Sequence, residues 1–104
     1  MIDLKGVVNF CVEELGITDK VVVEVYLEDL TEDHAHGWCH NDFENDDIYE
    51  LEIEKTLDDD EMLVALCHEM VHVRQYSEGY DANETEAYDL ENELAEKYRS
   101  LLVV

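Results

Sequence analysis

Residues 48–54, IYELEIE, alternate strictly between apolar and acidic side chains. A period of two is the pattern of a β-strand, because successive side chains point to opposite faces of a sheet. The run predicts a strand with Tyr49, Leu51 and Ile53 turned inward and its glutamates outward. A row of carboxylates discourages unwanted pairing, so we expect this strand at an edge of its sheet.

The first half of the chain contains one helical and two further strand-like patterns. Residues 3–15 place apolar side chains three and four positions apart and end at Gly16, which predicts a helix. Residues 21–27, VVVEVYL, are rich in β-branched residues and predict a strand. The segment 34–40, HAHGWCH, alternates less clearly and is interpreted as a second short strand.

The second half of the chain predicts two helices. Residues 56–77 open with Asp58 and Glu61 at the spacing of a capping box, and the pattern ends before Gly79. A final helix is expected over 82–102. Its expected buried stripe consists of Ala87, Leu90, Leu94, Tyr98 and Leu101.

The chain lacks any marker of a domain boundary. It has no proline, no Gly/Ser-rich linker and no internal repeat, so residues 1–104 are expected to form one α+β domain in the order α-β-β-β-α-α. The three cysteines are odd in number and far apart, which favours reduced thiols in a reducing compartment.

The charge balance excludes two classes of partner. Six Lys and Arg stand against 29 Asp and Glu, a formal net charge of −23. Such a polyanion repels nucleic-acid phosphates and anionic lipid headgroups. No apolar stretch approaches a membrane span, and the first residues lack the basic region of a signal peptide. We therefore expect a cytoplasmic protein, or a virion-associated one if the chain is viral.

One motif within residues 56–77 indicates a metal-binding site. His68-Glu69-Met70-Val71-His72 has the HExxH pattern. Residues four apart lie one turn apart on the same helix face, so both imidazoles can bind one metal ion. Glu69, about 100° round the helix, can reach a water bound to that ion.

A catalytic zinc also needs a third protein ligand. Glu84 and Glu86 are the candidates, and they point about 200° apart on a helix, so only one can face the metal. Glu86 continues the buried stripe one turn before Leu90, whereas Glu84 has capping-box spacing from Asp81, which favours Glu86 as the ligand. Alternatively, Asn83 caps the helix with Glu86 as its partner, which would free Glu84.

These two segments, HEMVH on a helix and ETEAY opening the next helix, resemble the gluzincin class of zinc metallopeptidases, especially single-domain minigluzincins. The resemblance covers about residues 58–98. It implies a zincin-like fold with an N-terminal helix, a small three-stranded sheet, an active-site helix and a C-terminal glutamate helix. It also implies that residues 48–54 form the edge strand that holds a peptide substrate.

The resemblance supports Glu86 as the ligand, since the ligand glutamate of thermolysin-like members is followed by alanine, as Glu86 is here. One departure concerns the aspartate often found four residues after that glutamate. Leu90 occupies the position, and Asp89 is the available substitute for supporting the site.

The sequence thus predicts a zinc metallopeptidase for neutral or basic peptide segments. His68, His72 and Glu86 would hold Zn²⁺, and Glu69 would act as general base. The alternative is a non-catalytic, zinc-stabilised binding module whose site is closed by a fourth group. The candidates for that group are His40, Glu78 and Asp81. A third hypothesis is an acidic viral or adaptor protein without metal.

Other polar residues are interpreted as structural. His34, His36 and His40 would share a strand face and could bind a second ion, but a solvent-facing polar segment is the favoured interpretation. Trp38 is expected to anchor the core, and Arg74 to form a structural ion pair.

Overall fold

A computed structural model describes residues 2–42 and 44–102 and has the predicted α+β order. A 3₁₀ turn over Thr31–Asp33 lies between the first two strands. The helices are α1 (Leu4–Leu15), α2 (Asp59–Ser77) and α3 (Glu84–Leu101), and the strands are β1 (Val22–Glu28), β2 (Gly37–Asn41) and β3 (Ile48–Glu54).

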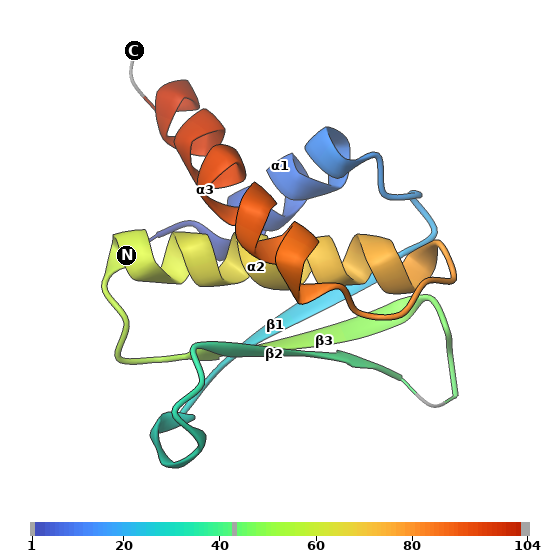
Figure 1. Cartoon of the computed structure of the whole chain (residues 1–104), viewed down its shortest axis with the longest axis horizontal. Helices are drawn as coiled ribbons and strands as arrows, with labels where there is room; N and C mark the ends of the chain where they lie inside the picture. The colour runs from blue at the N-terminus through green and yellow to red at the C-terminus, as the bar shows by residue number, and fades with distance from the viewer. Residues whose placement is uncertain (1, 43, 103–104) are drawn as a thin grey trace.

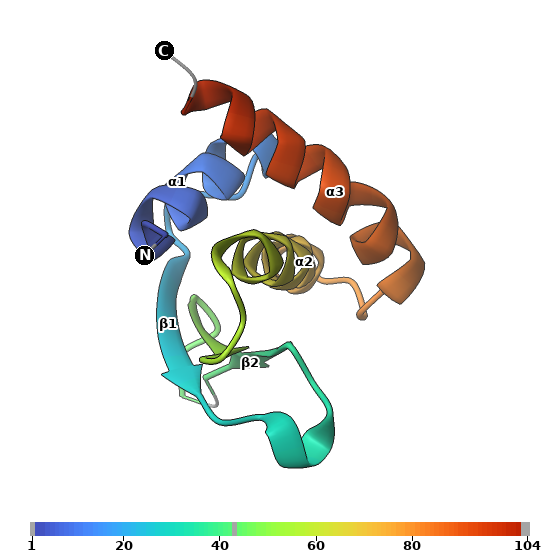
Figure 2. The same ribbon diagram turned by 90° about the vertical axis from the view of Figure 1, so that its left-hand side faces the viewer.

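The three strands form a mixed sheet in the order β1-β3-β2. β1 pairs with β3 in parallel, and β2 pairs with β3 antiparallel. The prediction of 48–54 as an edge strand is therefore wrong, because β3 is central. Figures 1 and 2 show all three helices on one side of the sheet, so Glu50 and Glu52 point away from the helices even from the central strand. The alternation of acidic residues in β3 indicates that no helix covers the outer face of the sheet, and it does not show whether the strand is central or at an edge.

Helix α2 lies at the centre of the molecule, with the sheet on one side and α1 and α3 on the other (Figure 2). The predicted capping box starts it: Asp58 accepts a hydrogen bond from the Glu61 backbone N–H at 2.8 Å, and Glu61 accepts one from the Asp58 N–H at 3.3 Å. Because α2 is surrounded, polar side chains in its second half are buried together with the apolar ones. These polar residues are His68, Glu69, His72 and Gln75.

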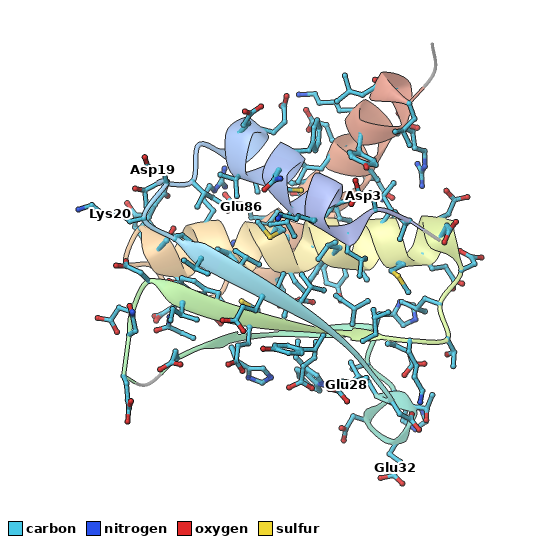
Figure 3. The ribbon with its side chains drawn as sticks, turned by 180° about the vertical axis from the view of Figure 1, so that it is seen from behind. Asp3, Asp19, Lys20, Glu28, Glu32 and Glu86 are labelled. Carbon is cyan, nitrogen blue, oxygen red and sulfur yellow. The ribbon has the colours of Figure 1, made fainter. Side chains whose placement is uncertain are left out.

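The inner face of β3 packs as expected, with Tyr49, Leu51 and Ile53 buried in the core. Glu54 departs from the prediction, since it is only 3% exposed. Its carboxylate accepts hydrogen bonds from the backbone N–H groups of Leu30 at 2.6 Å and Thr56 at 2.9 Å. A loop thus folds over the outer face of the sheet at this end, where Figure 3 places Glu28 and Glu32.

Two predicted core positions are wrong. Leu101 is 64% exposed because α3 extends past the body of the molecule (Figure 1), and Trp38 is 41% exposed because it lies on the outer face of β2. Ala87, Leu94 and Tyr98 are buried as predicted. No helix within the described ranges is long and apolar enough to span a bilayer.

Candidate metal centre

His68, His72 and Glu84 bring three potential ligand atoms together, all within 4.8 Å of one another. The Glu84 carboxylate lies 3.2 Å from His68 Nε2 through Oε2, and 2.6 Å from His72 Nε2 through Oε1. α2 supplies the two imidazoles one turn apart, and the first residue of α3 supplies the carboxylate. Two ligand atoms of a tetrahedral zinc are about 3.4 Å apart, so the separation from His68 is close to that of a ligand set, whereas the separation from His72 is shorter, at hydrogen-bond distance.

Both imidazoles are oriented through their other nitrogen. His68 Nδ1 lies 2.8 Å from Glu91 Oε2, and His72 Nδ1 lies 2.8 Å from Gln75 Oε1. A carboxylate and an amide oxygen only accept, so each Nδ1 is the protonated nitrogen and donates. The Nε2 atom of each ring thereby faces Glu84, and a metal ion bound between them would receive both Nε2 lone pairs, the arrangement that metal-binding histidines require.

The expected third ligand, Glu86, is placed elsewhere. Its carboxylate accepts hydrogen bonds from Arg74 Nη2 at 2.7 Å and Gln75 Nε2 at 3.0 Å. The alternative considered from the sequence is the one observed, because Asn83 is the N-cap and its side chain accepts from the Glu86 N–H at 3.1 Å. This cap sets the rotation of α3 so that Glu84 faces the imidazoles. Glu86 instead forms the ion pair expected of Arg74 and holds the Gln75 amide that orients His72.

Glu69 lies beside the ligands and is only 7% exposed. The pKa of its carboxyl is raised to about 7, mainly by burial; His72 opposes the shift, and the carboxylates of Glu84 and Glu91 add to it. No hydrogen bond to this carboxylate is found among the described residues. The group is therefore held by packing, with its proton-accepting oxygens uncommitted.

An open cleft of about 720 Å³ exposes the cluster, with Glu84, Tyr88 and Glu91 of α3 on one side and residues 34–39 on the other. The Tyr88 ring lies 4.8 Å from the His68 ring, and the Tyr76 ring lies 6.3 Å from that of His72. Three carboxylates line this cleft, and no Lys or Arg does among the described residues. The charge of the cleft therefore favours a cation.

The free edge of β2 borders the cleft. The Glu54 N–H donates to the His36 carbonyl at 2.8 Å, and the Asp42 N–H donates to the Ile48 carbonyl at 2.9 Å. Backbone bonding alternates along an antiparallel pair, so the even-numbered residues of β2 bond to β3. Gly37 and Cys39 direct their N–H and C=O groups to the open edge.

The histidines of residues 34–40 do not form a second cluster. His34 ends the 3₁₀ turn with φ 53°, His36 precedes β2, and His40 Nε2 lies 3.3 Å from Glu52 on the outer face of the sheet. Within residues 2–42 and 44–102, only His68, His72 and Glu84 meet as potential ligands. His40, Glu78 and Asp81 thus do not join this site as a fourth group.

The donor set fits a divalent metal ion with an open position. Two imidazole nitrogens and one carboxylate match three ligands of a catalytic site, and the side facing the cleft is free for a further ligand. The group could hold such an ion.

Sequence interpretation missed the two residues that support the imidazoles. Glu91 is seven positions after Glu84, two turns along the same face of α3, so helical spacing contained the signal. Gln75 is three positions after His72, also on one face. Asp89, the substitute considered for this role, is exposed.

Comparisons of the chain with protein-family models, with curated proteins and with solved structures find no significant match. The assignment of a function therefore rests on the geometry of this site.

Proposed function

We propose that the protein is a zinc-dependent metallopeptidase in which His68, His72 and Glu84 hold the metal. The observation that carries the proposal is the convergence of the two Nε2 atoms and the Glu84 carboxylate, while Glu91 and Gln75 engage both Nδ1 atoms. Imidazole nitrogens with a carboxylate suit zinc better than magnesium or calcium, which prefer oxygen ligands alone.

Glu69 is the proposed general base. When bound, zinc supplies a Lewis acid that polarises a carbonyl and lowers the pKa of water. The Glu69 carboxylate then accepts a proton from the attacking water and delivers it to the leaving amine. A carboxyl with a pKa near neutrality suits both transfers, and the lack of hydrogen bonds to other described residues leaves its oxygens available.

The free edge of β2 is the proposed docking site for the substrate backbone. An extended peptide can pair with the N–H and C=O groups of Gly37 and Cys39, which border the same cleft as Glu69. This replaces residues 48–54, which the resemblance had suggested for the role. Because the cleft carries carboxylates and no Lys or Arg among the described residues, we expect neutral or basic segments to be favoured over acidic ones.

The test combines metal counting with cleavage. Protein purified without chelator should contain about one zinc per chain, and zinc should be lost from Glu84→Ala. A library of short peptides should be cleaved by the zinc-loaded protein and not after chelation.

Two results would contradict the proposal in different ways. If the protein does not bind about one zinc ion per chain when zinc is supplied at micromolar concentration, the proposed metal site is excluded. Tight zinc binding without cleavage of any peptide would instead support the non-catalytic, zinc-stabilised module.

A further inference from the structure

We propose that Gly37 is a positioning residue for Glu69: its missing side chain makes the space in which the Glu69 side chain lies against β2. The catalytic consequence rests on the proposed peptidase function, whereas the effect on the Glu69 position does not. The inference concerns a strand residue 32 positions away in the sequence and outside the HExxH motif.

Backbone conformation does not explain a glycine at this position. Gly16 and Gly79 have positive φ angles of 66° and 85°, and a Cβ atom there would meet nothing within 4 Å. Gly37 is not among the residues with positive φ, so any residue could adopt its backbone angles. The reason for glycine must be the space around it.

A Cβ atom on Gly37 would be crowded from three directions. It would lie 3.1 Å from Glu69 Cγ, 3.1 Å from Ile53 Cδ1 and 3.2 Å from the Glu52 carbonyl oxygen. Each separation is shorter than ordinary van der Waals contact, so each neighbour must give way by a few tenths of an ångström or the added methyl group must shift towards the neighbour that yields most easily.

Glu69 is the neighbour that can move. The Glu52 carbonyl belongs to the central strand, which is paired on both sides. Ile53 is fully buried in the core, where close packing resists displacement. The Glu69 side chain borders the open cleft and has no hydrogen bond to another described residue. A methyl group at position 37 would therefore displace this carboxylate.

The test is a set of four zinc-loaded proteins: wild type, Gly37→Ala, Ile53→Val and the double variant. Gly37→Ala should bind zinc within about threefold of wild type, because the three atoms nearest to the added Cβ belong to none of the proposed ligands. Its kcat should fall by about three- to tenfold with little change in KM, since a shift of a few tenths of an ångström is a fraction of the 1 Å misplacement that can cost about 100-fold. A crystal structure should show the Glu69 carboxylate displaced from its wild-type position.

Ile53→Val supplies the matched control and the rescue. It removes the Cδ1 atom that crowds position 37, so the single variant should keep nearly wild-type kcat and the double variant should regain part of the lost rate. If Gly37→Ala alone does not fold, the double variant provides the crystal structure.

An unmoved Glu69 carboxylate in the Gly37→Ala structure would overturn the inference, as would an unchanged kcat in that variant. If only the double variant folds, a Glu69 carboxylate displaced no further than in Ile53→Val would overturn it, because the added methyl group still crowds Glu69 Cγ. If the wild type cleaves no peptide, the proposed function fails while the crystallographic comparison still decides the role of Gly37.

Discussion

Two buried glutamates, one in each layer of the molecule, show how surroundings separate a structural carboxylate from a reactive one. Glu54 at the end of β3 is 3% exposed, and Glu69 in the middle of α2 is 7% exposed. Hydrogen bonds from Thr56 and from the Leu30 backbone lower the pKa of Glu54, whereas burial without such bonds raises the pKa of Glu69 to about 7.

The two carboxylates differ in the hydrogen-bond donors that surround them. Glu54 accepts the backbone N–H groups of Leu30 and Thr56 and the Thr56 hydroxyl, so its negative charge is stabilised by the fold. Glu69 has apolar and backbone neighbours on one side and the cleft on the other. Similarly low exposure therefore accompanies opposite pKa shifts, because hydrogen-bond donors dominate at Glu54 and desolvation dominates at Glu69.

The largest expected effect separates the two glutamates by activity. Glu69→Gln should lower kcat/KM for peptide cleavage by about 10²- to 10⁴-fold, the contribution of a positioned general base. Glu54→Gln should keep activity within about tenfold, because it lies outside the cleft. Steady-state kinetics on proteins with equal zinc content provide the measurement, and retained turnover in Glu69→Gln would remove Glu69 from the role of base.

A second contrast concerns Glu84 and Glu86, two residues apart on α3. Glu84→Gln should weaken zinc binding by at least about 100-fold, since it removes a charged ligand, whereas Glu86→Gln should weaken it less than about tenfold because Glu86 acts only through Gln75. Competition titration with a zinc chelator measures both constants. Equal losses would contradict the assignment of Glu84 as the ligand.

The overall fold could be predicted because its patterns are local. The apolar stripe of α1, the valine alternation of β1 and the Asp58 cap of α2 each depend on residues within one element. The position of β3 in the sheet could not be predicted in the same way. Its outward-facing glutamates give the same alternation in a central and an edge strand when no layer covers that face.

The residues of the candidate site could likewise be predicted where they depend on spacing within one helix, and not where they depend on packing between helices. The HExxH spacing fixes His68, Glu69 and His72 on one helix, so sequence alone predicted these three. The choice between Glu84 and Glu86 depends on how α3 crosses α2, which Gln75 influences by binding the Asn83 backbone N–H and C=O at 3.0 Å each. The spacing of residues within one helix does not predict how that helix packs against another.

The stability of the metal-free protein should also separate the two buried glutamates. At pH 8, Glu69→Gln removes a desolvated charge and should raise the free energy of unfolding by an amount on the order of 2 kcal/mol. Glu54→Gln removes a charge that the surrounding donors stabilise and should lower it. Urea unfolding in the presence of chelator measures both, with Glu50→Gln on the same strand as the control for losing one carboxylate. Changes of the same sign in the two variants would contradict the contrast.

The smallest expected effect is the pH dependence contributed by Glu54. Its pKa in the folded protein is lowered from 4.5, so the unfolded chain binds more protons between the two values. The stabilisation by Glu54 is therefore fully present above about pH 4.5 and is lost as pH falls through the lower, folded value. Urea unfolding of wild type and Glu54→Gln between pH 6 and pH 3 should show a difference in unfolding free energy that shrinks below about pH 4.5. The remaining carboxylates titrate in both proteins, so a difference that stays constant down to pH 3 would mean that the Glu54 charge does not hold the Leu30 loop.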